Sequence, residues 1–179
     1  MANPINILIV EHTLIKKMLN VIRKKIDQMR ESQEVDLMFI DIVVDFFKTF
    51  VDRIHHGKEE KIFFHELSQK NLTEEHKNIV NRLENDHKKA KETVGKIIAA
   101  KHKYNVGDQG GLKEFMDLLE FFLQMYPPHI KIEDETFFYE AIKYFNPEEQ
   151  NNLFERFNSF DPELNMEKYS IIVENLEQE

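Results

Sequence analysis

The chain has 179 residues, a formal net charge of −9 and no cysteine. Its length fits one domain with a sizeable core, and its charge argues against nucleic acid and an anionic membrane surface as partners. Without cysteine, disulfides, thiolate metal sites and cysteine nucleophiles are excluded. The apolar run of residues 5–10 is too short to span a bilayer and lacks a basic flank, so we expect a cytoplasmic protein. We expect it to be a monomer or a homodimer.

Hydrophobic periodicity predicts four long helices with short connections. We expect them over residues 4–30, 35–67, 73–102 and 111–145. The segment 104–111 is the clearest loop, and Asn146-Pro147 and Asp161-Pro162 each begin a shorter helix. The predicted fold class is therefore all-α: an antiparallel up-down four-helix bundle over residues 1–145, with a helical extension, residues 146–179, packed on it.

One histidine falls on the apolar face of each long helix. These histidines are His12, His55, His87 and His129. On the first helix, for example, the histidine shares its stripe with Leu8, Ile15 and Leu19. At 1.5 Å rise per residue, His12 and His55 lie about 27 and 30 Å from the turn that joins their helices. The four histidines are therefore expected at one level of the bundle.

Two of these histidines are followed one helical turn later by a glutamate. The pairs are His55-x-x-x-Glu59 and His129-x-x-x-Glu133. Residues four apart lie on the same helix face, so each pair offers a nitrogen and a carboxylate to one point. A third pair, His56-x-x-x-Glu60, follows the polar face that carries Asp45 and Asp52, so we expect it to point outward.

Four imidazoles and two carboxylates at one level predict a two-metal site inside the bundle. A buried ionised glutamate costs several kcal/mol unless it is paired or bound to metal, which leaves a metal-free polar network as the alternative. Nitrogen and oxygen donors suit iron, manganese or zinc. The remaining histidines are expected at the surface or at helix ends: His56, His65, His76 and His102.

Two prolines, Pro127 and Pro128, directly precede His129 on the fourth helix. Proline lacks the backbone N–H that an α-helix needs, so this pair should kink or locally unwind the helix. Such a distortion would help to aim His129 and would influence access to the site.

The residues around the four histidines resemble those of hemerythrin-like proteins, in particular the HHE cation-binding group. The resemblance spans about residues 5 to 145 and is carried by four stretches: Ile9 to His12, His55 to Phe64 (HHGKEEKIFF), Glu84 to His87, and His129 to Phe138 (HIKIEDETFF). It implies a non-haem di-iron centre bridged by Glu59 and Glu133. It also implies that His12 and His55 bind one iron, and that His87 and His129 bind the other.

The chain departs from the oxygen-carrying members of that family. Carriers have five histidines, two of them spaced His-x-x-x-His on the third helix, whereas the positions four residues from His87 are Leu83 and Lys91. The set of four histidines and two glutamates is more similar to the di-iron domain of iron–sulfur cluster repair proteins. Those relatives usually carry an additional N-terminal segment with cysteine, and this chain has no cysteine.

Three functions follow as hypotheses. The first is a di-iron protein, with an oxo or hydroxo bridge, that binds or senses O2 or NO or takes part in the response to oxidative stress. The second is iron–sulfur cluster repair, or an activity that reduces peroxide or NO. The third is a helical interaction module in which the metal is structural. No catalytic side chain and no organic cofactor is predicted.

Overall fold

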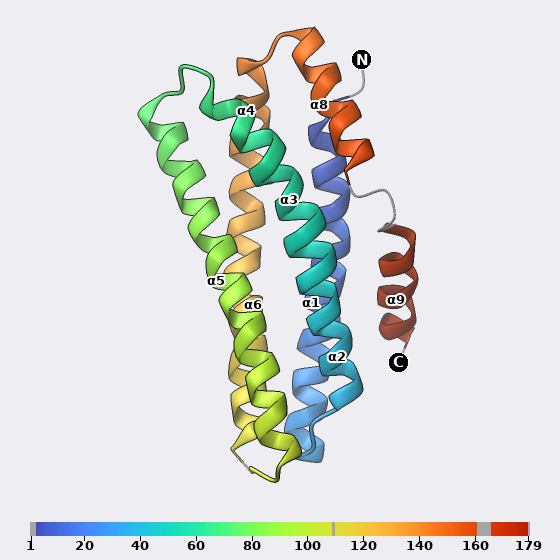
Figure 1. Cartoon of the computed structure of the whole chain (residues 1–179). Helices are drawn as coiled ribbons and strands as arrows, with labels where there is room; N and C mark the ends of the chain where they lie inside the picture. Colours follow the sequence, from blue (N-terminus) through green and yellow to red (C-terminus); the bar gives the residue numbers. More distant parts are fainter. Residues whose placement is uncertain (1–2, 109, 161–165, 179) are drawn as a thin grey trace.

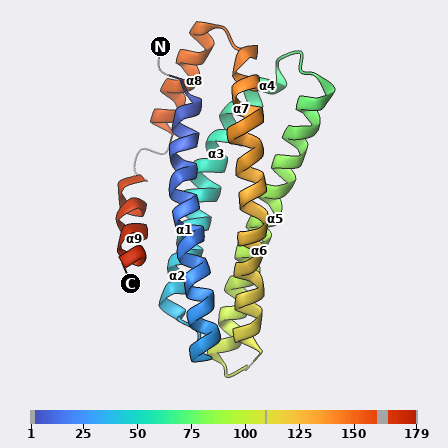
Figure 2. The ribbon, with the colours of Figure 1, turned by 180° about the vertical axis from the view of Figure 1, so that it is seen from behind.

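The computed structural model describes residues 3–108, 110–160 and 166–178. Four long helical segments run side by side in alternating directions (Figures 1 and 2). They are α1 (Ile5–Ser32), a segment over residues 37–68, α5 (Glu74–Asn105), and a segment over residues 111–144. The fold is therefore all-helical and consistent with a hemerythrin-like bundle, as the sequence predicts.

The second and fourth segments change helix type along their length. The second consists of α2 (Leu37–Asp45), η1 (Phe46–His55), α3 (His56–Lys58), η2 (Glu59–Phe64) and α4 (His65–Ser68). The fourth consists of α6 (Gly111–Ile132), η3 (Glu133–Phe137), α7 (Phe138–Ala141) and η4 (Ile142–Tyr144). The η1, η2 and η3 stretches are π-helical. Such wide turns are rare and are frequently found at functional sites; here they contain His55, Glu59 and Glu133.

Side-chain caps fix where several helices begin. The Asp36 carboxylate accepts a hydrogen bond from the Phe39 N–H, and the Thr73 hydroxyl accepts one from the His76 N–H. Asn146 and Glu149 form a reciprocal capping box at the start of α8 (Pro147–Ser159). The α5 helix ends at Asn105, three residues later than the predicted end at His102.

Of the kink or local unwinding expected at the paired prolines, the unwinding is wrong. The α6 helix continues as a regular α-helix through Pro127 and Pro128, and the change to a π-helix comes only at Glu133. Both prolines are exposed. The carbonyl groups that lose their N–H partners belong to Leu123, which is partly exposed, and Gln124, which is exposed. Water can satisfy them, which removes the main reason for the helix to open.

Two hydrophobic clusters fill the bundle, one above the other. One cluster contains Leu8, Leu83 and Phe137, and the other contains Ile15 and Ala90. The histidine of each long helix lies along its helix between residues of the two clusters, as His12 lies between Leu8 and Ile15. The four histidines therefore form a polar layer between two apolar cores.

Two shorter helices cover the outside of the bundle. The α8 helix packs against η2, and α9 (Met166–Gln178) packs against α1 and η1 (Figure 1). The proposed start of the last helix at Asp161-Pro162 lies outside the described residues. At the end of α8, the Phe160 ring lies so close to Gly57 that an added Cβ would come within 2.8 Å of it.

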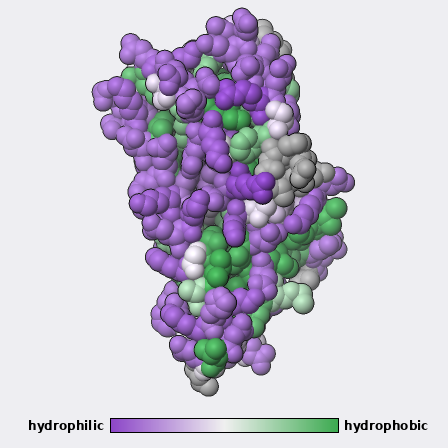
Figure 3. All heavy atoms as spheres, viewed as in Figure 1, coloured by the Kyte–Doolittle hydropathy of each residue, from purple (hydrophilic) through white to green (hydrophobic). Residues whose placement is uncertain are grey.

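The outer surface is largely hydrophilic on the face of Figure 3, where hydrophobic side chains gather mainly in the lower half and beside α9. Among the described helices, none combines the length and apolar character needed to cross a membrane.

Candidate metal centre

The structure brings all six predicted ligands together in the interior. Their exposed fractions are between 0 and 3%. The ligand atoms of His12, His55, Glu59 and Glu133 all lie within 4.8 Å of one another. His87 and His129 belong to a second group on the other side of the two glutamates, together with His56. Two groups of potential ligands therefore face each other across a pair of carboxylates.

Each of the two glutamates spans both groups. The Glu59 Oε1 atom lies 3.4 Å from His55 Nε2, and its Oε2 atom lies 3.3 Å from His87 Nε2. The Glu133 Oε2 atom lies 3.3 Å from His12 Nε2, and its Oε1 atom lies 3.3 Å from His129 Nε2. In each glutamate, one carboxylate oxygen thus faces the first histidine group and the other oxygen faces the second. A carboxylate needs this arrangement to bridge two ions.

The other ring nitrogen of each histidine faces a carboxylate farther out. His12 Nδ1 lies 2.6 Å from Asp134 Oδ1, and His55 Nδ1 lies 3.0 Å from Glu11 Oε2. His87 Nδ1 lies 2.8 Å from Glu60 Oε1, while His129 Nδ1 lies 3.7 Å from Asp86 Oδ2. An ionised carboxylate can only accept, so a hydrogen is held on Nδ1, and Nε2 is the inward nitrogen that can bind an ion once any proton on it is displaced. Histidine ligands of metals are held by outer carboxylates in this way.

His56 is buried, and the expectation that it points outward is wrong. Its exposed fraction is 1%, and its ring stacks on the His87 ring with centroids 3.7 Å apart. The π-helical η1 stretch immediately before it has more residues per turn than an α-helix. An α-helical period of 3.6 residues therefore places His56 on the outer face, although it lies on the inner one. Glu60 remains about 40% exposed, as expected, although its carboxylate contacts His87.

The interior of the site contains polar atoms that hydrogen bonding leaves unsatisfied. Among the described residues, buried atoms without a hydrogen-bond partner include both carboxylate oxygens of Glu59 and Glu133, both ring nitrogens of His56, and Nε2 of His87 and His129. Buried polar groups in proteins rarely lack a hydrogen-bond partner. Ligands about 2.0–2.2 Å from one ion lie roughly 3 Å apart, close to the observed nitrogen–oxygen separations. The donors therefore fit metal ions better than a metal-free network.

Burial and charge set the protonation of the two glutamates in opposite directions. Burial, together with the charges of Glu133 and Glu11, raises the pKa of Glu59 well above its usual value. Burial alone would also raise the pKa of Glu133, but the adjacent His129 and His12 outweigh it and hold that pKa well below its usual value. Without metal, a proton shared by the pair therefore favours Glu59 over Glu133.

Two buried residues beside the site were not anticipated from the sequence. Glu11 is 3% exposed and accepts hydrogen bonds from His55 and from Lys58, which is itself 6% exposed. Burial opposes ionisation of Glu11, but these two partners lower its pKa overall. An acidic residue directly before a predicted ligand histidine was the available signal. The predicted surface residues His65 and His102 are exposed, and His76 is half-buried.

Metal uptake is expected to strengthen as pH rises toward about 9. Burial would lower the pKa of His129, but Glu133 and Asp86 outweigh it and raise the pKa to about 9. In the metal-free protein this ring is therefore protonated near neutral pH, and an incoming ion must displace its proton. Titration against a competing chelator at several pH values measures the effect. The same affinity at pH 7 and about pH 9 would contradict it.

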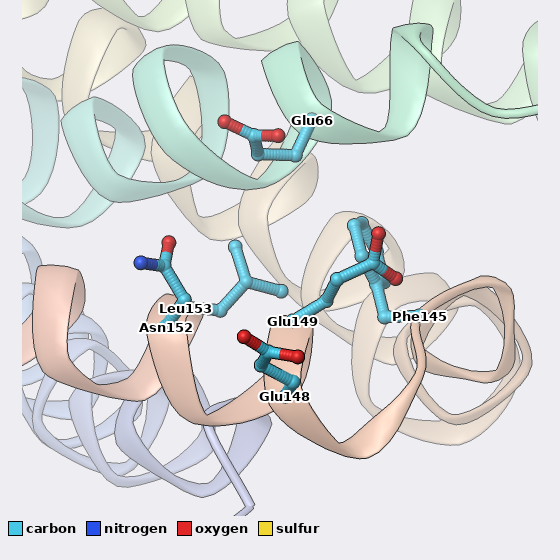
Figure 4. A pocket seen from close by; sticks show the side chains of 6 residues that line it. All are labelled: Glu66, Phe145, Glu148, Glu149, Asn152 and Leu153. Carbon is cyan, nitrogen blue, oxygen red and sulfur yellow. The ribbon is translucent and has the colours of Figure 1, made fainter.

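The pocket between α4 and α8 is a separate feature (Figure 4). Three of its lining residues are Glu66, Glu148 and Glu149, but Glu66 pairs with Arg156 at 2.6 Å and Glu149 pairs with Lys70 at 2.6 Å. None of the six predicted ligands lines it. The histidine layer is therefore the candidate site.

The fold and this layer of histidines and carboxylates define a helical-bundle protein built to bind cations. A family model described as Hemerythrin HHE cation binding domain matches residues 3–141. The chain therefore belongs to the hemerythrin HHE cation-binding family. Comparisons with curated proteins and with solved structures found no match.

Proposed function

We propose that this chain is a cytoplasmic di-iron protein whose metal centre binds O2, NO or peroxide in sensing these species or in the response to oxidative stress. The observation that carries the proposal is the double-sided histidine arrangement. Each of the four Nε2 atoms lies 3.3–3.4 Å from an oxygen of Glu59 or Glu133, while each Nδ1 faces an outer carboxylate. This geometry supports two ions that share both carboxylates.

The two proposed metal positions have unequal donor sets. His12 and His55 supply two nitrogens on one side, whereas His87, His129 and His56 supply three on the other. His56 has no hydrogen-bond partner for either nitrogen among the described residues, and burial lowers its pKa well below the usual value. It is therefore neutral and free to act as a ligand. We infer that a small ligand binds on the side of His12 and His55, where fewer protein donors are present.

The side chains around the site restrict what can reach it. The Phe138 ring stacks on His12 with centroids 5.9 Å apart, and the Phe64 ring stacks on His87 at 6.3 Å. Both phenylalanines are buried. They exclude water while leaving a small apolar or weakly polar molecule less hindered. Iron, when bound, supplies the electrons needed to reduce O2 or peroxide.

The test is an optical and Mössbauer comparison of iron-loaded protein, prepared without air, before and after addition of O2, NO or peroxide. We expect two ions per chain, two inequivalent iron signals, and a new near-ultraviolet or visible absorption after at least one addition. Fully iron-loaded protein without any spectral change would refute the proposal and leave a structural role for the metal.

His56→Phe and His65→Phe provide a matched pair for the same measurements. His56→Phe keeps a ring stacked on His87 but removes the third nitrogen, so the two iron signals should become more alike. His65 is exposed on α4, and its replacement should leave the spectrum unchanged. Identical spectra for both variants would remove His56 from the ligand set.

A further inference from the structure

A series of buried aromatic rings connects the metal centre to the C-terminal helix. Tyr126 contacts the rings of His56 and His129 at centroid distances of 6.5 and 6.2 Å. From Tyr126 the contacts continue to Phe47 at 5.3 Å, from Phe47 to Phe46 at 5.4 Å, and from Phe46 to Tyr169 at 5.8 Å. All of these tyrosines and phenylalanines are at most 2% exposed.

The two ends of the series differ in their surroundings. Tyr126 lies on α6 among the site histidines, whereas Tyr169 lies on α9, which packs against α1 and η1 (Figure 1). The Tyr169 hydroxyl donates to Asp45 Oδ2 at 3.2 Å. The Asp45 side chain is about half exposed and also pairs with Lys168. A proton that leaves Tyr169 therefore has an acceptor that is in contact with solvent.

The amino-acid composition makes these tyrosines suitable electron donors. The chain contains no tryptophan and no cysteine, so tyrosine is its most easily oxidised aromatic residue. Phenylalanine is too difficult to oxidise to hold a radical, but its packed ring improves electronic coupling between neighbours. Tyr126 and Tyr169 are therefore two oxidisable sites joined through Phe47 and Phe46.

We propose that Tyr126 and Tyr169 carry oxidising equivalents out of the metal centre when hydrogen peroxide is reduced there. The inference rests on the proposed di-iron function. For each peroxide, the O–O bond breaks, two tyrosines each lose one electron and one phenolic proton, and two water molecules and two tyrosyl radicals result. The proton from Tyr126 goes to one of the product waters at the centre. The proton from Tyr169 passes to Asp45 and on to solvent, and one proton taken from solvent completes the second water. The route keeps the oxidation away from the ligand histidines.

The test is freeze-quench electron paramagnetic resonance of the iron-loaded full chain after addition of hydrogen peroxide. Wild-type protein should give a tyrosyl signal that narrows when the tyrosines carry ring deuterium. Tyr126→Phe should lose the signal at Tyr169 as well as its own, because the first step is removed. Tyr169→Phe should retain only a radical at Tyr126, and this radical should decay faster.

Tyr139→Phe is the matched control, because Tyr139 on α7 is 47% exposed and lies outside the ring series. All three variants keep the aromatic ring, and metal analysis before each experiment establishes that iron is bound. Mass spectrometry should find more oxidised His56 and His129 in Tyr126→Phe than in the control.

Three outcomes would overturn the route. They are peroxide consumption without a tyrosyl radical, a radical unaffected by both Tyr126→Phe and Tyr169→Phe, and equal histidine oxidation in Tyr126→Phe and Tyr139→Phe. Each of these leaves the proposed di-iron function standing. A chain that binds no iron would overturn the proposed function and the route together, and the initial metal analysis distinguishes that case.

Discussion

Replacing Glu59 with alanine is expected to abolish binding of both metal ions. The Glu59 carboxylate faces His55 with one oxygen and His87 with the other, so its loss removes a donor from both positions at once. It also leaves Glu133 as the only carboxylate in direct contact with the inward nitrogens, in a site with an exposed fraction near zero. Metal content per chain, measured by mass spectrometry after desalting, should fall from two ions to background.

Two other glutamates provide controls, one that contacts a ligand histidine and one that lies at the surface. Glu60→Ala removes the partner of His87 Nδ1 but no predicted ligand atom, so both ions should remain while affinity falls about 10- to 100-fold. Glu135→Ala changes an exposed residue of η3, so the number of metal ions bound per chain and the affinity for them should be unchanged. Equal metal content in Glu59→Ala and Glu135→Ala would contradict the bridging assignment.

The inward faces of the regular α-helices could be predicted from hydrophobic periodicity, because their hydrogen-bond pattern is uniform over many turns. His12, His87 and His129 lie on α1, α5 and α6, where a 3.6-residue period holds, and all three are buried as predicted. The chain therefore contains enough information in its apolar spacing to place these rings at one level.

The second segment was harder to predict because it departs from α-helical geometry where the site lies. With π-helical turns on both sides of residues 56–58, His55, His56, Lys58 and Glu59 are all buried. A single α-helix cannot direct four consecutive or near-consecutive side chains inward, so a 3.6-residue period divides these residues between two faces. π-Helical turns are rare, and the sequence offers one hint of them here, which is a run of charged residues within a stretch that is otherwise buried.

The outer carboxylates could not be assigned from helix faces either. Asp86 and Asp134 are each adjacent in sequence to a predicted ligand, yet they reach histidines of other helices, as Asp134 on η3 reaches His12 on α1. Their partners depend on how neighbouring helices are rotated, which is a property of the packed bundle. Ring orientation at the site is therefore decided by tertiary structure, although the ligands themselves are visible in the sequence.

Removing the metal is expected to lower the melting temperature by roughly 10 °C or more. An ion present at about 1,000 times its Kd stabilises the folded state by about 4 kcal/mol, and each kcal/mol corresponds to about 2–4 °C in a chain of this size. Part of this stabilisation arises because the ions satisfy buried atoms of Glu59, Glu133, His87 and His129, each of which costs about 1–3 kcal/mol when it has no partner. Differential scanning calorimetry with and without a strong chelator measures the change.

A variant without the two bridging carboxylates distinguishes the loss of metal binding from the loss of stability of the fold. A variant with Glu59→Leu and Glu133→Leu cannot bridge ions, but it also removes four buried oxygens that lack partners in the metal-free chain. Replacing buried charged groups with apolar residues of similar volume is often neutral or stabilising. We therefore expect this variant to melt above the chelated wild-type protein and to be insensitive to chelator. If chelation left the wild-type melting temperature unchanged, the polar layer would be satisfied without metal, and the hydrogen bonds of the layer alone would have to hold it together.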